Sequence, residues 1–269
     1  MPSKIWDLLG PVRKRVNDEK GTLSNVGSLR IALCHPSPYK VGMSSLGFQT
    51  LYREMNLHMD VSAERSFLPD NPGEYRKNRS PVFTYENETP LNDFPIIAFS
   101  ISYELEISGL LEILDLSGIP VLRRQRKPAH PLIVAGGPLT NSNPFILAPF
   151  VDVIILGEGE DLIHSLLDAL LAMDRKSLLD RFSKIPGCYV PDVSRENPTI
   201  AKVPDDRLPA YSQIVTPNAV WASMFLIEAE RGCSRECAYC VMRRSTGGPR
   251  KNSINMLNAR WSGPAWTNI

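Results

Sequence analysis

Short apolar runs alternate with amphipathic stretches along residues 29–171, and this alternation restricts the folds that the chain can adopt. Four runs have the length of buried strands, at 29–34, 96–101, 132–135 and 153–156. Apolar residues between and after them recur at i, i+3, i+4 and i+7, which is the spacing of an amphipathic helix. These residues are Phe48, Leu51, Tyr52 and Met55, then Ile107, Leu110, Leu111 and Leu114, then Leu162, Ile163, Leu166, Leu167, Leu170 and Leu171. We therefore expect an α/β fold, with a parallel sheet and helices on both of its faces.

Glycine-bearing loops follow the predicted strands and are candidate binding sites. In folds of this kind a ligand binds beyond the carboxyl ends of the strands. Glycine lets the backbone approach a ligand closely, and a helix that begins after such a loop favours an anion. The candidate cofactor-binding residues are Gly42, Gly136, Gly137, Gly157 and Gly159. The same glycines also fit ordinary turn chemistry, and the chain has neither a G-x-G-x-x-G fingerprint nor a P-loop.

Composition does not indicate nucleic acid or a membrane as a partner. The formal net charge of +1 gives no electrostatic argument for nucleic acid or for an anionic membrane surface. No stretch approaches the length of about 18 apolar residues that a transmembrane helix needs. Five cysteines, three of them clustered, suit a reducing cytoplasm better than a disulfide scaffold. We expect the two outside the cluster, Cys34 and Cys188, to be plain buried thiols.

The clustered cysteines are Cys233, Cys237 and Cys240, at a C-x3-C-x2-C spacing. Residues 221–230 before them have the composition of a strand, and Tyr239 stands directly before the third cysteine. Three thiolates can hold three irons of a [4Fe–4S] cluster and leave the fourth iron open to a small molecule. The alternative is half of a zinc site, with Cys188 or a histidine as the fourth ligand. Structural zinc usually shows a second paired half-motif, which this sequence lacks.

Together with four further segments, the cysteine run resembles radical S-adenosylmethionine proteins that have an N-terminal cobalamin-binding-type domain. The segments are 38–47, 99–106, 135–138 and 157–160, so the resemblance extends roughly from residue 30 to residue 244. It implies a Rossmann-like domain that precedes a catalytic radical barrel. It also implies that Cys233, Cys237 and Cys240 hold the cluster and that its open iron binds S-adenosylmethionine.

The resemblance further implies a reaction class and a set of partners. In such enzymes the reduced cluster cleaves S-adenosylmethionine to a 5′-deoxyadenosyl radical, which abstracts hydrogen from a substrate. The expected partners are small-molecule cofactors and an electron donor such as flavodoxin or ferredoxin. Neither the substrate nor a catalytic side chain beyond the cluster ligands is implied.

Cobalamin is a cofactor of many relatives, but this sequence departs from their ligand pattern. Domains that supply a lower axial histidine use an Asp-x-His-x-x-Gly loop after the first strand. If Gly42 is that glycine, Ser37 and Tyr39 stand at the Asp and His positions. An imidazole nitrogen is a good ligand for a late transition metal, whereas a neutral tyrosine hydroxyl is not. His35 does not match the pattern, and we interpret it as a loop histidine; we expect weak cobalamin binding or none.

The predicted organisation has five parts: an N-terminal segment at 1–27, the Rossmann-like cobalamin-binding-type domain at 28–175, a connector at 176–222, the beginning of the radical domain with the cluster loop at 223–244, and an irregular tail at 245–269. A (β/α) barrel needs roughly 200 residues or more, and residues 241–269 cannot supply them. The sequence therefore predicts an incomplete barrel in a truncated chain that is inactive alone. The alternative is a non-catalytic module in which the first domain holds cobalamin, a nucleotide or a partner protein.

Overall fold

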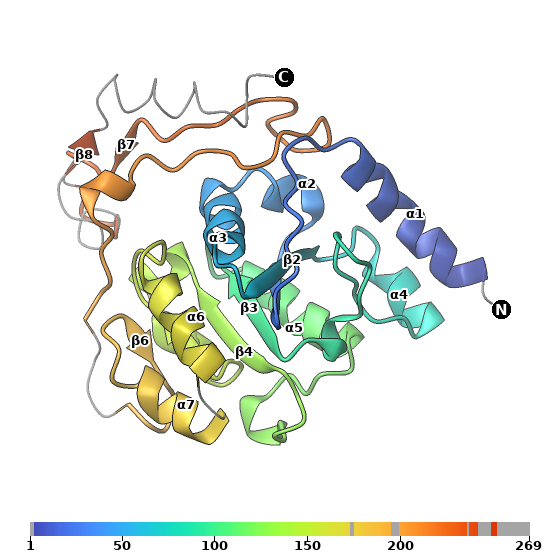
Figure 1. Ribbon diagram of the computed structural model, residues 1–269, viewed down its shortest axis with the longest axis horizontal. Coiled ribbons are helices and arrows are strands. Elements are labelled where there is room, and N and C mark those ends of the chain that lie inside the picture. The colour runs from blue at the N-terminus through green and yellow to red at the C-terminus, as the bar shows by residue number, and fades with distance from the viewer. Residues whose placement is uncertain (1–2, 173–174, 195–198, 236, 242–248, 252–269) are drawn as a thin grey trace.

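A six-stranded sheet forms the centre of the molecule (Figure 1). The computed structural model describes residues 3–172, 175–194, 199–235, 237–241 and 249–251. The strands are β1 Leu29–His35, β2 Val61–Phe67, β3 Ile96–Ser100, β4 Leu132–Gly136, β5 Val153–Ile155 and β6 Cys188–Tyr189. Their order is β2-β1-β3-β4-β5-β6, with parallel pairing throughout except for antiparallel β6. This mostly parallel sheet confirms the expected α/β class and is consistent with a Rossmann-like arrangement.

Helices cover both faces of the sheet, as the alternation of the sequence requires. The α-helices are α1 Ser3–Asn17, α2 Tyr39–Gly42, α3 Leu46–Leu57, α4 Pro72–Asn78, α5 Glu106–Leu116, α6 Leu162–Ala172 and α7 Arg175–Phe182. Short 3-10 helices lie at Leu91–Asp93, Arg123–Gln125, Pro138–Asn141, Pro144–Leu147 and Asp205–Arg207. Two further strands, β7 Glu230–Arg231 and β8 Arg250–Lys251, pair with each other away from the main sheet.

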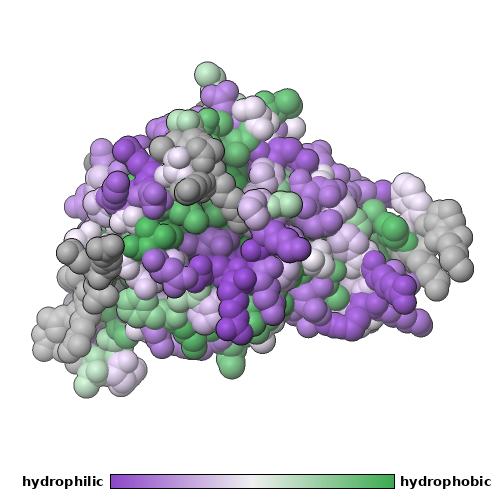
Figure 2. Space-filling model, turned by 90° about the horizontal axis from the view of Figure 1, so that it is seen from below, coloured by the Kyte–Doolittle hydropathy of each residue, from purple (hydrophilic) through white to green (hydrophobic). Residues whose placement is uncertain are grey.

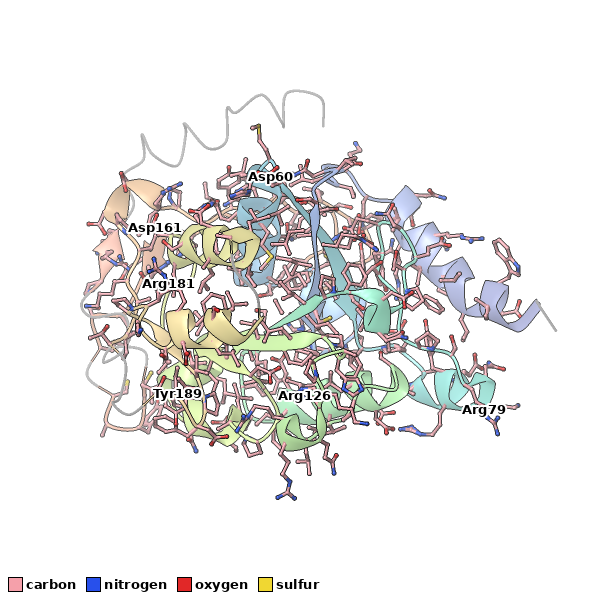
Figure 3. All side chains as sticks on the ribbon, turned by 60° about the horizontal axis from the view of Figure 1, so that its bottom comes forward. Asp60, Arg79, Arg126, Asp161, Arg181 and Tyr189 are labelled. Carbon is pink, nitrogen blue, oxygen red and sulfur yellow. The ribbon has the colours of Figure 1, made fainter. Side chains whose placement is uncertain are left out.

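Alternate residues of each strand point to opposite faces, and each face has its own apolar core. Ile31 and Leu33 of β1 pack with α3, α6 and α7, whereas Ala32 and Cys34 pack with α5 on the other side. Side chains fill the space between the sheet and these helices (Figure 3). The face drawn in Figure 2 is mainly hydrophilic, with apolar side chains in small groups. The two cores account for most of the buried apolar surface and hold the strands in register.

The strand order places a topological switch point between β1 and β3. From β1 the chain first adds β2 on one side and then adds β3, β4 and β5 on the other. In doubly wound sheets with the order 2-1-3-4-5, the crevice at this switch point is where ligands bind, beyond the carboxyl ends of the strands. The loops after β1, β3, β4 and β5 therefore define the region in which a site is expected.

Strand β2 was not expected from the sequence because it carries Glu64 and Arg65. All seven of its residues are nevertheless buried. The Nε of Arg65 donates to Glu86 at 2.6 Å, and its Nη2 donates to Glu19 at 2.7 Å. Burial alone would lower the pKa of Arg65, but the two carboxylates raise it well above its ordinary value. The guanidinium is therefore charged and paired inside the protein, which allows a polar segment to form a buried strand.

The prediction of a strand over residues 221–230 is wrong. Within that range only Glu230 is in a strand, as the first residue of β7, and Ile227 forms an isolated bridge with Tyr211. This stretch makes only scattered backbone hydrogen bonds with a neighbouring loop. In one of them, Glu228 N donates to Ala210 O at 2.9 Å. Without a continuous ladder of partners the segment cannot extend as a strand.

The described residues contain no barrel, because β7 and β8 make only a two-stranded sheet beyond the main one. The five-part division of the chain stays a prediction. The main sheet itself extends past residue 175, since Cys188 and Tyr189 pair with Ile155 and Ile154. The predicted tail at 245–269 falls mainly outside the described residues.

Helix α5 offers a test of the packing. Leu110 is completely buried against the sheet, whereas the adjacent Leu111 is only half-buried. Leu110→Ala should therefore lower the free energy of unfolding by about 2–5 kcal/mol, and Leu111→Ala should cost clearly less. Urea unfolding of both variants measures the difference. Equal losses would show that α5 presents a different face to the sheet.

Candidate functional site

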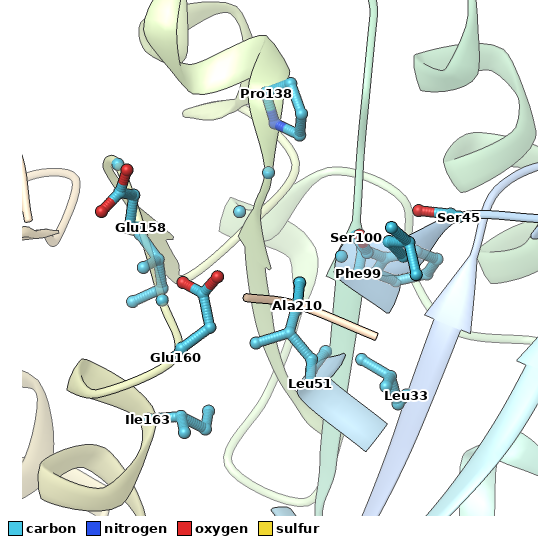
Figure 4. A pocket seen from close by; sticks show the side chains of 18 of the residues that line it. Leu33, Ser45, Leu51, Phe99, Ser100, Pro138, Glu158, Glu160, Ile163 and Ala210 are labelled. Carbon is cyan, nitrogen blue, oxygen red and sulfur yellow. The ribbon is translucent and has the colours of Figure 1, made fainter. Parts of the chain in front are cut away.

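A cavity of about 310 Å³ lies at the carboxyl ends of β1, β3, β4 and β5. We call it the sheet-edge cavity. Leu33, Phe99 and Ser100 lie on one side of it, and Glu158 and Glu160 lie on the other (Figure 4). Most of its remaining wall is apolar, contributed by one face of the sheet and by α3 and α6: Leu51, Met55, Ala98, Val134, Ile155, Ile163 and Leu166. A partly enclosed apolar space with a few polar groups is the usual form of a small-molecule site.

The glycine loops contribute to this cavity, with one exception. Gly136, Gly137, Gly157 and Gly159 line it, as expected for loops that follow β4 and β5. Gly137 has a φ of 111°, and a Cβ there would come within 2.5 Å of the Ile101 carbonyl oxygen. Only glycine can hold that backbone without strain and overlap.

Gly42 does not line the sheet-edge cavity. It ends α2, and a Cβ at this position would meet the Phe67 ring at 2.5 Å. The structure therefore gives Gly42 a role in packing against β2. The position of the cavity does not support Gly42 as a cofactor-binding residue.

A cluster of charged side chains forms the rim of the cavity. Arg231 donates to Glu228 at 2.8 Å through Nε, and its Nη2 lies 2.7 Å from Glu160. Its Nη1 lies 3.7 Å from Glu158. Burial alone would lower the pKa of Arg231, but Glu228 and Glu160 raise it above its ordinary value. The arginine is thus a fixed cation held among three carboxylates.

The sequence drew attention to the glycines of the 157–160 loop, but not to its glutamates. No local pattern could have revealed their partner, because Arg231 follows in the chain only after a long connector. The available signal was the charge of Arg231 close to Glu228 and Glu230 in the sequence. That signal is too common to identify an ion pair by itself.

The three clustered cysteines lie directly after Arg231. Cys237 is exposed, whereas Cys233 and Cys240 are half-buried, and all three are free thiols. Arg235 N donates to Cys233 Sγ at 3.4 Å, and Cys240 N donates to the Cys237 carbonyl oxygen at 3.2 Å. Among the residues that the structure describes, no three Cys, His, Asp or Glu side chains are gathered closely enough to hold a metal ion. Three free thiols on one loop match the donor chemistry of an iron–sulfur cluster, but the loop must draw their sulfurs together to bind one.

Cys34 and Cys188 are buried, as expected. Burial raises the pKa of the Cys34 thiol far above its ordinary value and that of Cys188 to about 12. Zinc binds the thiolate form of cysteine, so a buried thiol that resists ionisation is a poor fourth ligand. The position of Cys188 in β6, within the apolar core, thus argues against the half-zinc alternative.

His35 is not a loop histidine. It is the last residue of β1, it is buried, and its ring packs edge-on against Phe48 with 5.5 Å between the ring centres. Its Nδ1 accepts a hydrogen bond from Ser37 N at 3.3 Å, and its Nε2 lies 3.9 Å from Glu106. Burial lowers its pKa, with Glu106 opposing the change. The side chain belongs to the core and is absent from the described lining of the cavity.

Comparison with known proteins places this architecture in a family. Residues 47–191 match the family described as radical SAM proteins, N-terminal. The chain belongs to this family. The matched range includes β2 to β6 and most of the cavity wall. It ends before the segment between β7 and β8, residues 232–249, which carries the three cysteines and which we call the cysteine loop. No solved structure matches the chain.

Two curated proteins illustrate the relationship. The uncharacterized protein MJ0966 of Methanocaldococcus jannaschii is 26% identical over 230 residues, which are 84% of this chain and 44% of that protein. The 2-(S-pantetheinyl)-carbapenam-3-carboxylate methyltransferase of Streptantibioticus cattleyicolor is 30% identical over 145 residues, 44% of this chain and 20% of that protein. The chain therefore spans less than half the length of these relatives. No helix in the described part of the chain is both long enough and apolar enough to span a membrane.

The loop after β5 provides a paired test of the glycine geometry. Gly157 has a φ of 93°, and a Cβ there would lie 2.3 Å from the Ala201 carbonyl oxygen, so Gly157→Ala should lower the free energy of unfolding by about 1–3 kcal/mol. At Gly159 a Cβ would meet only Leu51, at the ordinary distance of 3.5 Å. Gly159→Ala should therefore lower the free energy of unfolding by less than about 0.5 kcal/mol. Thermal unfolding of both variants measures the difference. A larger loss for Gly159 than for Gly157 would contradict this loop geometry.

Proposed function

We propose that this chain is the N-terminal part of a radical S-adenosylmethionine enzyme and that its cysteine loop binds the catalytic cluster. Cys233, Cys237 and Cys240 would ligate a [4Fe–4S] cluster whose open iron takes S-adenosylmethionine. When bound, the cluster supplies the electron that cleaves S-adenosylmethionine and starts radical chemistry on a substrate. The observation that carries the proposal is that Arg231 lies at the rim of a cavity built mainly by a radical SAM family domain, and that a run of three free thiols begins two residues after it.

In this proposal the sheet-edge cavity holds a second small molecule beside the cluster. Its walls come from apolar side chains such as Phe99 and Ile155, which exclude water from a bound ligand. Removing water strengthens the electrostatic interactions at the rim, where Glu158, Glu160 and Arg231 lie. Because one relative is named as a methyltransferase, methyl transfer is the first reaction to test for the whole protein.

We further propose that cobalamin binds weakly here or not at all. Ser37 and Tyr39 occupy the Asp and His positions of the ligand loop, and both are engaged internally. The Ser37 hydroxyl donates to Glu106 at 2.9 Å, and the Tyr39 hydroxyl donates to Glu19 at 2.7 Å. No histidine is among the described residues that line the cavity.

Titration with hydroxocobalamin tests this part of the proposal. The visible spectrum should keep the form of the free cofactor, because no described residue that lines the cavity carries an imidazole to displace its ligand. The matched control is His35→Gln, which should behave like the parent chain. A stoichiometric complex with a histidine-type spectral change, lost in His35→Gln, would overturn it.

Anaerobic reconstitution with iron and sulfide tests the cluster. The chain should take up about four irons and four sulfides, as expected for a cube. Cys237→Ala should abolish the uptake, because it removes one of the three thiolates. Cys34→Ala and Cys188→Ala are matched controls that remove buried thiols and should keep the cluster. Addition of S-adenosylmethionine should change the electron paramagnetic resonance spectrum of the reduced cluster, since it binds the open iron.

The outcome also separates the competing proposals. Binding of one zinc ion that is lost in both Cys237→Ala and Cys188→Ala would replace the cluster with a zinc site. A chain that takes up no metal would favour the non-catalytic module, with the cavity as its binding site.

A further inference from the structure

The two strands that flank the cysteine loop form one pair of opposite charges, Glu230 with Lys251, and one pair of like charges. Strand β7 precedes the loop and β8 follows it, and their antiparallel register pairs Arg231 with Arg250. Like charges directly across a strand pair are destabilising. Each strand has two residues, and so short a ribbon is not stable by itself in water. Side-chain contacts must therefore hold the two ends of the loop together.

A single carboxylate, that of Glu158, reaches both arginines. Its Oε1 forms an ion pair with Arg250 and lies 3.7 Å from Nη1 of Arg231. Its Oε2 accepts a hydrogen bond from Val203 N at 2.7 Å, which fixes the side chain in place. The Glu158 side chain is only 9% exposed. Charge-assisted hydrogen bonds are strong where water is excluded, so this contact can offset the repulsion between the two cations.

The neighbouring carboxylates act at one end of the ribbon. Glu160 and Glu228 bind Arg231 at 2.7 Å and 2.8 Å. Arg250 also contacts Asp205, at 3.4 Å, but the Asp205 side chain is 78% exposed and is screened by water. Within the described part of the chain, Glu158 is the carboxylate that contacts both strands.

We propose that Glu158 is a positioning residue, which neutralises the opposed Arg231 and Arg250 and thereby fastens both ends of the cysteine loop to the sheet-edge cavity. The proposal rests on the proposed function only in that it treats this loop as the cluster site. The contact joins the loop after β5, which belongs to the matched family domain, to the segment that carries the thiols. The spacing between the two stems of the cysteine loop therefore depends on a residue of the preceding domain.

Hydrogen exchange on the full chain without metal tests the positioning directly. Glu158→Gln keeps the size of the side chain and removes its charge. Amides of a peptide spanning residues 228–235 should then exchange about tenfold faster, because the ribbon opens more often. Peptides from β1 and β3 should keep their protection, which shows that the domain is still folded.

Asp161→Asn is the matched control. Asp161 lies in the same loop, at the start of α6 (Figure 3), and pairs with Arg207 at 3.4 Å with both side chains about half exposed. Such a surface pair contributes little, so exchange of the 228–235 peptide should change less than about twofold. A similar acceleration in both variants would overturn the proposal, since any charge change in the loop would then have the same effect.

A double-mutant cycle separates neutralisation of charge from simple packing. If Glu158 acts on the opposed cations, Glu158→Gln should have much less effect in an Arg250→Gln background, because the repulsion is already gone. The double variant should then exchange at β7 at about the rate of Arg250→Gln alone. Additive effects, or unchanged exchange in Glu158→Gln, would refute the positioning role.

The rate at which the reconstituted chain loses iron tests whether Glu158 also affects the cluster site. After reconstitution, the Glu158→Gln chain should lose iron to a chelator several times faster than the Asp161→Asn chain, because its thiols are less well held. Equal rates of iron loss would overturn the positioning of the cluster site by Glu158. If no variant and no parent chain takes up iron, the proposed function fails, whereas the exchange results still decide the role of Glu158 in the ribbon.

Discussion

The parallel pairing of β1, β3, β4 and β5 is the constraint on which the rest of the molecule depends. Parallel strands end at the same edge, so the loops that follow them must meet there. The switch point between β1 and β3 separates two of these loops and leaves space for the sheet-edge cavity. Glycines at 136, 137 and 157 let the backbone pass close to neighbouring chain at this edge. The fold thus provides a partly enclosed apolar site before any charged residue is considered.

Two arginines, the buried Arg65 and the largely buried Arg231, then determine which distant segments are held on this scaffold. Arg65 binds Glu19 and Glu86, and so ties the chain before β1 and the segment after α4 to the edge strand. Arg231 binds Glu160 and Glu228 at the rim of the cavity. A buried ion pair adds little net stability relative to an apolar pair, but loss of one partner leaves an uncompensated charge and is costly. These contacts therefore specify an arrangement of segments more than they stabilise the fold.

The sequence predicted the strands that are continuous apolar runs and missed those that are not. Residues 29–34 and 96–101 are apolar because helices cover both faces, which makes them visible as buried strands. In β2, Arg65 and Glu64 interrupt the pattern, and their burial depends on partners such as Glu86 that lie elsewhere in the chain. Strand β6 has two residues and no pattern of its own. Local composition cannot reveal a strand whose stability comes from ion pairs between remote residues.

The candidate site shows the same division between local and long-range information. Cysteine spacing is local, so Cys233, Cys237 and Cys240 could be proposed as a ligand set from eight residues of sequence. Whether their sulfurs can converge depends on the distance between the two stems of the loop. In our proposal that distance depends on Arg231 and Arg250, which lie opposite each other and both contact Glu158 of the preceding domain. Under this proposal the cysteine motif specifies the chemistry of the site, whereas the preceding α/β domain supplies the charge that can hold the motif in a binding geometry.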